Sequence, residues 1–327
     1  MHAIRQYSFG PPSNLRYEPV DDPPVGLDQV RIAVAAAGVH LIDTNIRRGE
    51  SGGPFPLPSL PMTPGREVAG VVDAVGSSAD PAWLGKRVVA HLGQASGGYA
   101  ELAVVAESAL HSVPDTVSDD VAVAMIGTGR TTMGILEGAA LRADDVVLIT
   151  AAAGGIGSLL VQEAVRVGAL AVGVAGGTAK VEVVRRLGAA VAVDYTVPDW
   201  ASVVRAALDG REVTVALDGV GGELGRGALE LLGVGGRLLM FGWSSGAQIP
   251  LTAGDLLARG LTAGVAVGPK LLRRPGGLRD LETAALAAAA SGRLAPLIGQ
   301  TFPLAKAADA HTALESRNTM GKVVLKP

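Results

Sequence analysis

Cysteine is absent from this chain of 327 residues. Without it the chain forms no disulfide bond, no thiolate nucleophile and no zinc site built on sulfur, and the redox compartment stays undecided. An excess of positive charge is absent too, because 28 Lys and Arg stand against 31 Asp and Glu, for a formal net charge of −3. This balance argues against a broad basic face for nucleic acid or anionic lipid.

Long apolar segments are missing as well. Residues 146–162 carry no charge, but they include Thr150, Ser158 and three glycines and fall short of the roughly 18 to 20 apolar residues that a membrane-spanning helix needs. The first residues, M-H-A-I-R-Q-Y, lack the basic and apolar blocks of a secretory signal. We therefore expect a soluble, cytoplasmic protein with no membrane partner.

The residues that are abundant indicate a large globular core. Hydrophobic residues supply 48% of the chain and charged residues 18%, which is enough apolar side chain for a core and too little charge for disorder. The length predicts about two domains. Glycine, at 45 residues, far outweighs the aromatic content of 3% and predicts many tight turns and close backbone approaches.

The pattern of elements changes along the chain. In the first third, turns rich in Pro and Gly separate short β-type runs and predict mostly antiparallel structure, with strands at 30–37, 68–75, 87–91 and 99–105. From about residue 120, β-type runs alternate with helical patterns, which predicts βαβ units and a parallel sheet with strands at 146–150, 171–175, 190–194, 214–218 and 237–242. The last part predicts helices at 278–290 and 307–314 and a strand at 322–325.

The segment 144–162, D-D-V-V-L-I-T-A-A-A-G-G-I-G-S-L-L-V-Q, joins an apolar strand to an amphipathic helix. Glycines at such a junction let the backbone turn sharply, let a pyrophosphate approach and let the helix pack close to the strand. The phosphate then lies at the helix N-terminus, where N–H groups and the helix dipole favour an anion. The segment predicts a dinucleotide site whose residues here are Ala152, Gly154, Gly155, Ile156 and Gly157.

The end of the second strand of this region favours NADPH. A site that prefers NAD places an acidic residue there to bind the ribose 2′-OH, but the strand ends A-V-G-V-A-G-G-T-A-K. Gly176 and Gly177 leave room for a 2′-phosphate, and Lys180 offers a countercharge. Tyr195 adds a hydroxyl or a stacking face from the neighbouring loop. Taken alone, Lys180 is equally a solvated helix residue and Tyr195 an aromatic at a loop edge.

Five segments together resemble one family over essentially the whole chain. They are G-V-H-L-I-D-T-N-I-R-R-G (38–49), P-G-R-E-V-A-G-V-V-D-A-V-G (64–76), A-A-A-G-G-I-G (151–157), L-L-M-F-G-W-S-S-G (238–246) and G-K-V-V-L (321–325). They resemble the medium-chain dehydrogenases/reductases, in particular the zinc-free quinone oxidoreductase branch that includes zeta-crystallin. The resemblance implies an α/β protein with a mostly-β, GroES-like catalytic domain (1–122 and 269–327) and a Rossmann domain with a doubly wound parallel sheet that binds NADPH (123–268). It places the active site in the cleft between the two domains.

The resemblance also assigns cofactor-binding residues. Gly176, Lys180 and Tyr195 match the positions that hold the adenosine 2′-phosphate, and Arg317 matches a position that contacts the cofactor. The expected set is completed by Val220, Phe241, Gly242 and Ser245.

The chain departs from its zinc-using cousins at the metal ligands. Those proteins carry a Cys two residues after the glycine that corresponds to Gly38 and a His in G-H-E-x-x-G, whereas this chain has His40 and Arg66 there and keeps only Glu67. A catalytic zinc needs about three protein ligands, and the four-cysteine structural lobe is missing too. We therefore expect no metal site; a zinc-dependent secondary-alcohol dehydrogenase is the alternative if zinc is found.

The expected lack of a metal site limits the class of substrate. Oxidation of a plain alcohol is difficult without a Lewis acid, whereas quinones and α,β-unsaturated carbonyl compounds delocalise charge themselves. We expect an NADPH-dependent reductase of small-molecule quinones or other activated carbonyl compounds. The alternatives are a 2-alkenal or enone reductase, and a zeta-crystallin-like NADPH-binding protein with little turnover. The family resemblance also implies a homodimer, for which residues 261–267 are the candidate edge strand.

Three residues are candidates for catalysis. The branch commonly has Asn at the position of His40 and Tyr at that of Asn45, both on the substrate side of the cleft. Here His40 can donate a hydrogen bond or a proton, unless it is a satisfied histidine of the cleft wall, and Asn45 can orient the nicotinamide amide or the substrate carbonyl. Thr131 matches a position near the nicotinamide. We expect Asp43 to be a structural hydrogen-bonding partner of the backbone.

Overall fold

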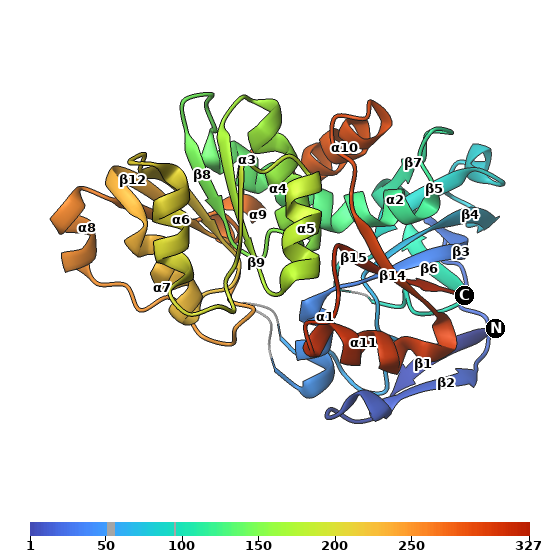
Figure 1. The fold of residues 1–327 in the computed structure, drawn as a ribbon. Coiled ribbons are helices and arrows are strands. Elements are labelled where there is room, and N and C mark those ends of the chain that lie inside the picture. The colour runs from blue at the N-terminus through green and yellow to red at the C-terminus, as the bar shows by residue number, and fades with distance from the viewer. Residues whose placement is uncertain (51–55, 95) are drawn as a thin grey trace. The chain divides into compact units, whose positions relative to one another are not determined.

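The chain forms two compact units in a computed structural model that describes residues 1–50, 56–94 and 96–327. Unit 1 contains Met1–Thr128 and Glu282–Pro327, and unit 2 contains Gly129–Leu281. Figure 1 shows that both chain ends lie in unit 1. The chain passes between the units within helical segments, a π-helical turn (Met125–Gly129) and α10 (Gly277–Ala290).

Unit 1 is built on a sheet of seven strands in the order β14-β15-β3-β4-β5-β7, with β6 paired to β3. All its pairings are antiparallel except that of β14 with β15, and a separate antiparallel pair is formed by β1 and β2. The strands are β1 (His2–Gln6), β2 (Leu15–Pro19), β3 (Gln29–Val39), β4 (Glu67–Val75), β5 (Arg87–His91), β6 (Leu102–Ala106), β7 (Leu110–Ser112), β14 (Ile298–Pro303) and β15 (Lys322–Lys326). The helices are α1 (Leu41–Arg48), α2 (Asp119–Ala124) and α11 (Ala307–Glu315), with short 3₁₀ turns at Pro12–Asn14, Pro81–Trp83, Glu107–Ala109 and Leu304–Lys306.

The core of unit 1 follows from the alternation of its strands. Val30, Ile32 and Val34 of β3 are buried and pack with Val68 and Val72 of β4 in one apolar cluster, because alternate side chains of a strand share a face. The strands predicted at 30–37, 68–75, 87–91 and 322–325 are confirmed. The strand predicted at 99–105 is wrong at its beginning: β6 starts at Leu102, since Ala100 pairs with Ala3 instead of continuing the pairing with β3.

Unit 2 contains a parallel sheet of six strands in the order β10-β9-β8-β11-β12-β13. The order runs outward from β8 in one direction and then from β11 in the other, which is the doubly wound Rossmann arrangement with its switch point between β8 and β11. The predicted fold class is therefore confirmed. The strands are β8 (Val146–Ile149), β9 (Leu170–Ala175), β10 (Val191–Asp194), β11 (Val213–Asp218), β12 (Leu232–Met240) and β13 (Thr262–Val265), and the helices are α3 (Arg130–Ala139), α4 (Gly155–Arg166), α5 (Thr178–Arg186), α6 (Trp200–Leu208), α7 (Gly222–Glu230), α8 (Ala253–Arg259) and α9 (Pro269–Leu272).

The predicted elements of unit 2 agree with the structure except at β12. This strand begins at Leu232 rather than near residue 237. Its first residues, L-G-V-G-G, have the composition of a turn, but Leu232 pairs with Val213 of β11, and the register shifts before Arg237 pairs with Val215. β8, V-V-L-I, is buried along its whole length, as expected for a strand covered on both faces.

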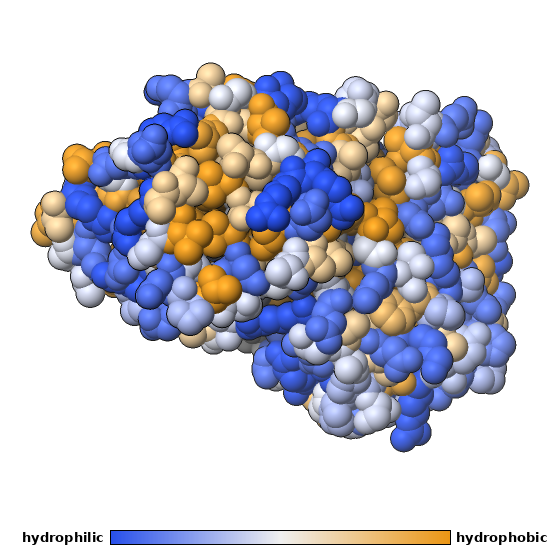
Figure 2. Space-filling model, in the orientation of Figure 1, coloured by the Kyte–Doolittle hydropathy of each residue, from blue (hydrophilic) through white to orange (hydrophobic). Residues whose placement is uncertain are grey.

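No helix in the described part of the chain is long and apolar enough to cross a membrane. On the face drawn in Figure 2, hydrophilic and hydrophobic residues are interspersed.

Candidate functional site

The turn between β8 and α4 provides the candidate phosphate site. Gly154 caps the helix, with its carbonyl accepting the first intrahelical bond from Ser158 N–H at 2.9 Å. The twelve-residue helix α4 begins after the turn that follows the apolar strand β8 and presents N–H groups at its N-terminus. The residues predicted for this site lie together in this turn and at the start of α4: Ala152, Gly154, Gly155, Ile156 and Gly157.

The glycines of this turn do not have the role that the sequence suggested for the sharp bend. Gly154 has a φ of −79°, and the positive φ of the turn belongs to Ala151, at 48°. Gly157 is needed for close packing instead: a Cβ there lies 2.3 Å from Ala151 O and 2.8 Å from Ala152 Cα. The bend is made by an alanine, and glycine allows the helix to approach the strand.

The ends of β9 and β10 meet beside α5. Gly177 caps α5 with a φ of 90°, and its carbonyl accepts a hydrogen bond from Lys180 N–H at 3.1 Å. A Cβ on Gly176 lies 2.9 Å from the Tyr195 hydroxyl, so the glycine makes room for this ring. The three residues predicted at the 2′-phosphate therefore lie near one another, at the ends of β9 and β10 and the start of α5: Gly176, Lys180 and Tyr195.

A buried carboxylate that the sequence analysis missed organises the ends of β8 and β11. Asp218 is fully buried, and it accepts hydrogen bonds from the Thr150 hydroxyl at 2.6 Å, Val220 N–H at 3.2 Å and Gly221 N–H at 2.8 Å. An acidic residue at the end of the apolar run V-T-V-A-L-D is the signal that could have revealed it. Asp218 thereby fixes the loop that contains Val220.

The loop after β12 lies against this one. Phe241 N–H donates to Asp218 O at 2.8 Å, and Ser245 N–H donates to Val220 O at 2.9 Å. A Cβ on Gly219 lies 2.3 Å from the Phe241 ring, and one on Gly242 lies 3.0 Å from Gly219 O. Val220, Phe241, Gly242 and Ser245 are therefore neighbours at the carboxyl edge of the parallel sheet, where doubly wound folds bind ligands.

Unit 1 contains a compact ionic cluster around Glu67. The Glu67 carboxylate is fully buried at the start of β4; its Oε2 lies 2.8 Å from His40 Nε2, and its Oε1 forms an ion pair with Lys322 Nζ. The Lys322 ammonium, only 4% exposed, lies 3.0 Å from the same His40 nitrogen. Burial by itself raises the pKa of Glu67, but the charges of His40 and Lys322 outweigh it and hold that pKa well below the ordinary value.

Two glycines make space for this carboxylate. A Cβ on Gly38 lies 1.9 Å from Glu67 Oε1, and a Cβ on Gly127 lies 2.1 Å from Oε2 and 3.1 Å from His40 Nε2. Any larger residue at either position displaces the carboxylate or the imidazole. The cluster is therefore enclosed by backbone on two sides, while the His40 side chain stays 22% exposed.

A second polar chain begins at the cap of α1. Asp43 Oδ2 accepts a hydrogen bond from His40 N–H at 2.9 Å, which confirms its predicted structural role, and it also accepts one from the Tyr99 hydroxyl at 3.1 Å. The Tyr99 hydroxyl lies 3.2 Å from Nε2 of the buried His311. Burial raises the pKa of Tyr99 and lowers the pKa of His311 to about 4, so both groups are neutral at pH 7. Neither was singled out from the sequence.

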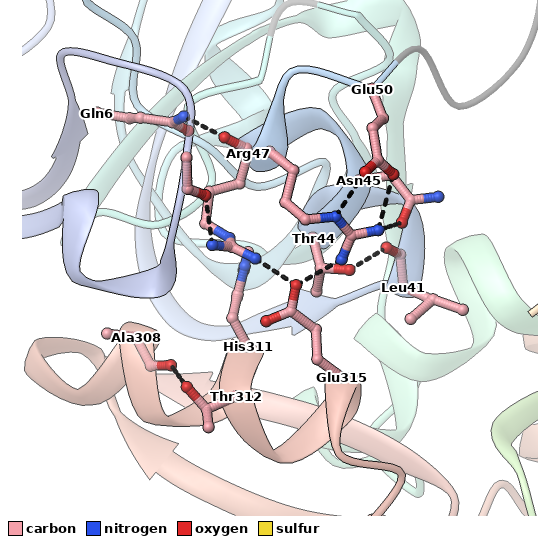
Figure 3. Close-up of polar contacts among 12 residues, drawn as sticks. Gln6, Leu41, Thr44, Asn45, Arg47, Glu50, Ala308, His311, Thr312 and Glu315 are labelled. Carbon is pink, nitrogen blue, oxygen red and sulfur yellow. Dashed lines mark hydrogen bonds and ion pairs between the residues drawn. The ribbon is translucent and has the colours of Figure 1, made fainter. Parts of the chain in front are cut away.

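Asn45 projects from the same helix toward a cluster of charged residues. Its Oδ1 accepts a hydrogen bond from Arg48 Nη2 at 2.7 Å, and Arg48 also binds Glu50 and Glu315 (Figure 3). His40 caps the N-terminus of α1, and Asn45 lies within this helix. Thr131 lies in the first turn of α3, within unit 2, and Arg317 follows α11 in unit 1 with a φ of 57°.

Comparison with known proteins defines the class. Residues 26–115 match the alcohol dehydrogenase GroES-like domain, and residues 187–325 match the zinc-binding dehydrogenase family. Together with the doubly wound parallel sheet of unit 2, these matches define an oxidoreductase with a nicotinamide cofactor and a small-molecule substrate.

The relatives define the family. The chain is 33% identical to a quinone oxidoreductase of Pseudomonas aeruginosa over 99% of both chains, and 32% identical to a 2-haloacrylate reductase of a Burkholderia species over 97% of this chain and 96% of the relative. The crystal structure of Escherichia coli quinone oxidoreductase complexed with NADPH superposes with a TM-score of 0.87 at 28% identity, covering 100% of both chains. The chain belongs to the quinone oxidoreductase family within the medium-chain dehydrogenases/reductases.

A catalytic zinc does not fit the donor set of unit 1, although one family match is described as zinc-binding. His40 and Glu67 are the donors at the positions of the family's metal ligands, but the ammonium of Lys322 contacts both, and a second cation beside an ammonium is strongly repelled. Across the described residues, no group of three or more His, Cys, Asp or Glu is arranged to hold a metal ion. His40 and Glu67 therefore contact the Lys322 ammonium, a cation that the chain itself supplies.

Proposed function

We propose that the protein uses NADPH to reduce quinones or other α,β-unsaturated carbonyl compounds, without a metal. The His40–Glu67–Lys322 cluster carries the proposal, because its side chains hold one another in place of a Lewis acid. Without that acid, the substrate must already be electron-poor. The relatives named quinone oxidoreductase and 2-haloacrylate reductase support this class of acceptor.

The residues predicted to act in catalysis take defined roles in this proposal. When bound, the nicotinamide supplies the hydride. The partly exposed imidazole of His40 donates a hydrogen bond to the acceptor oxygen as negative charge develops there, and supplies the proton that the reduced product takes up. Glu67 holds this ring, and Asn45 and Thr131 orient the acceptor carbonyl and the nicotinamide amide. The two Gly positions around Glu67 keep the ring in one place.

The choice of NADPH rests on the end of β9. No acidic residue follows this strand, whereas Gly176, Gly177 and Lys180 offer space and a positive charge for the 2′-phosphate. The Escherichia coli relative whose structure holds NADPH supports this choice. The adenosine side of the site therefore has the chemistry that a phosphomonoester needs.

Lys180→Ala tests the cofactor assignment. It should weaken NADPH binding by about 1.5 to 3 kcal/mol, the scale of a charged hydrogen bond, and leave NADH binding nearly unchanged. Fluorescence titration of both nucleotides gives the two dissociation constants. Arg185→Ala, which removes another cation from α5 where it pairs with Glu182, should change neither constant appreciably. Equal losses for NADPH and NADH in Lys180→Ala would refute the assignment.

An acceptor panel tests the reaction. NADPH oxidation is followed with 1,2-naphthoquinone, a 2-alkenal and 2-chloroacrylate, and NADP⁺ reduction with a secondary alcohol. We expect turnover with the quinone or an unsaturated compound and none with the alcohol, both unchanged after dialysis against a chelator. Tight NADPH binding without turnover on any acceptor would instead favour a nucleotide-binding protein of the zeta-crystallin kind. Activity lost on chelation and restored by zinc would overturn the metal-free mechanism.

A homodimer belongs to the same proposal. Among the described strands β13 pairs only with β12 and so forms one edge of the parallel sheet, and its Val265 is 58% exposed. An uncovered edge of this kind invites pairing with another strand. A second copy related by a two-fold axis covers it with the same strand.

A further inference from the structure

We propose that Asp194 sets the balance between NADPH and NADH: its carboxylate builds the loop that receives the adenosine ribose and at the same time opposes a phosphate bound there. The inference rests on the proposed use of NADPH and names the residue that limits its selectivity.

The first observation is how Asp194 joins two strands. It is the last residue of β10, and its Oδ1 accepts hydrogen bonds from Gly177 N–H at 2.9 Å, Thr196 N–H at 2.9 Å and the Thr196 hydroxyl at 2.7 Å. Gly177 follows β9 and caps α5. One oxygen therefore fixes both the turn after β9 and the turn after β10.

The second observation is what adjoins this oxygen. Tyr195 is the next residue in the chain, and its hydroxyl lies 2.9 Å from the position of a Cβ on Gly176. Lys180 N–H donates to the carbonyl of Gly177, the residue whose N–H binds Asp194. Of the three residues assigned to the 2′-phosphate, Tyr195 therefore follows Asp194 directly in the chain. Gly176 and Lys180 are each connected to Asp194 through Gly177.

The third observation is the charge of this group. The hydrogen bonds from Gly177 and Thr196 lower the pKa of Asp194 below its ordinary value, so the carboxylate is ionised at neutral pH. A carboxylate repels the dianionic 2′-phosphate of NADPH. It does not repel the 2′-hydroxyl of NADH, which sites selective for NAD bind with an acidic residue at the end of the neighbouring strand. Asp194 therefore favours NADH over NADPH, opposite to Lys180.

Asp194→Asn separates the two roles. The amide keeps an oxygen in the position that accepts all three hydrogen bonds and removes the negative charge. We expect the dissociation constant of NADPH to fall roughly two- to fivefold, the scale of one screened charge pair near the surface, with that of NADH equal or higher. Fluorescence titration at low salt and at high salt measures both, and the difference between variant and wild type should shrink at high salt.

Two further variants serve as controls for Asp194→Asn. Thr196→Val removes one hydrogen bond to Oδ1 without changing charge, so its ratio of NADPH to NADH dissociation constants should equal that of the wild type. Asp194→Ser also removes the charge and retains an oxygen acceptor, so it should shift the ratio toward NADPH even if Asp194→Asn folds poorly. Far-UV circular dichroism of each variant reports folding.

An unchanged ratio in Asp194→Asn and Asp194→Ser, or an equal weakening of both nucleotides, overturns this inference and leaves Asp194 a structural residue. If Lys180→Ala still weakens NADPH selectively in that case, the proposed use of NADPH stands. If neither Lys180 nor Asp194 variants change NADPH binding relative to NADH, the 2′-phosphate assignment itself fails.

Discussion

Glu67 is a fully buried carboxylate whose two oxygens contact different basic side chains. Removing ions of this size from water costs several kcal/mol each, which only close pairing compensates. The cluster is closed on two sides by Gly38 and Gly127, so water cannot easily replace a missing partner. Each member therefore depends on the others for its stability.

A double-mutant cycle should show this dependence. Glu67→Gln leaves the Lys322 ammonium buried without a counter-ion, and Lys322→Met leaves the carboxylate with His40 alone; each should lower the free energy of unfolding by about 3 to 5 kcal/mol. The double variant should lose clearly less than the sum, because neither lone charge remains. Urea unfolding with a constant slope gives the three values. Losses that add within about 0.5 kcal/mol would contradict a coupled pair.

His311 should make stability depend on pH. Its Nε2 lies 3.2 Å from the Tyr99 hydroxyl, and its Nδ1 has no hydrogen-bonding partner within the described residues. Burial lowers its pKa to about 4 from the ordinary 6.5, although the charge of Asp43 acts in the opposite direction. Between pH 6.5 and 4 the unfolded chain therefore binds a proton that the folded chain does not, so folding stability is full above the ordinary pKa and falls with acidification.

The expected loss of folding free energy across this interval is about 2 to 3 kcal/mol, because each pH unit between the unfolded and folded pKa values contributes about 1.4 kcal/mol. His311→Gln keeps a polar group for Tyr99 but cannot gain a charge. Over the same interval its free energy of unfolding should therefore fall by about 2 to 3 kcal/mol less than that of the wild type. Urea unfolding of both proteins at several pH values measures the difference. Parallel pH profiles would show that His311 does not cause the loss.

Individual site residues could be predicted from the sequence where they belong to a local sequence motif. His40 and Glu67 stood out in their motifs, and Gly176 and Lys180 follow one strand. Lys322 did not, because its contact with His40, 282 residues away, arises only when β15 pairs with β3 and Val323 lies opposite Val39. That register is a property of the folded sheet and has no local signal.

Among the elements, α1 is held against α11 by a buried arginine. Arg47 is 1% exposed; its Nη1 donates to Gly10 O at 2.6 Å, its Nη2 binds Glu315 of α11, and its backbone carbonyl accepts from Gln6 (Figure 3). Burial lowers the pKa of Arg47, yet the group stays charged at neutral pH because an arginine pKa is far above neutrality. The helix that begins beside His40 is thus anchored at its other end.

Arg47→Met and Arg48→Met compare a buried and an exposed anchor of this helix. Both arginines bind Glu315, but Arg48 is 36% exposed. Arg47→Met should cost about 1 to 3 kcal/mol of stability, since it also removes the bond to Gly10. Arg48→Met should cost less than about 1 kcal/mol, as a surface pair does. Thermal or urea unfolding compares them, and equal losses would mean that burial does not strengthen the Arg47 contact.

The strands found from the sequence are those with continuous apolar runs. β8, V-V-L-I, and β9, L-A-V-G-V-A, are almost entirely buried, so their composition alone indicated a strand. β14, I-G-Q-T-F-P, was missed: among the described strands it pairs only with β15, none of its residues is buried, and it contains Gly and Pro. Such a strand is defined by its partner rather than by its own residues.

For the whole molecule, the doubly wound order of unit 2 follows from alternating strands and helices, since right-handed crossovers leave few arrangements. This order leaves β10 and β13 as the edges of the sheet. β10 ends at Asp194, next to the predicted cofactor residue Tyr195, whereas β13 carries none of the predicted site residues. In the functions proposed above, the β10 edge contributes to the cofactor site and the β13 edge to assembly.

Val265→Lys tests assembly through β13. Val265 is the exposed last residue of this strand, and a charged side chain on an edge strand opposes pairing with another strand. The variant should be a monomer, or should raise the dimer dissociation constant at least about tenfold. Val234→Lys makes the same change at a valine of β12 that is 80% exposed and should leave the dimer intact. Sedimentation velocity over a range of concentrations gives the stoichiometry; a Val265→Lys dimer as stable as the wild type would place the interface elsewhere, and a monomeric wild type would show that the edge stays uncovered.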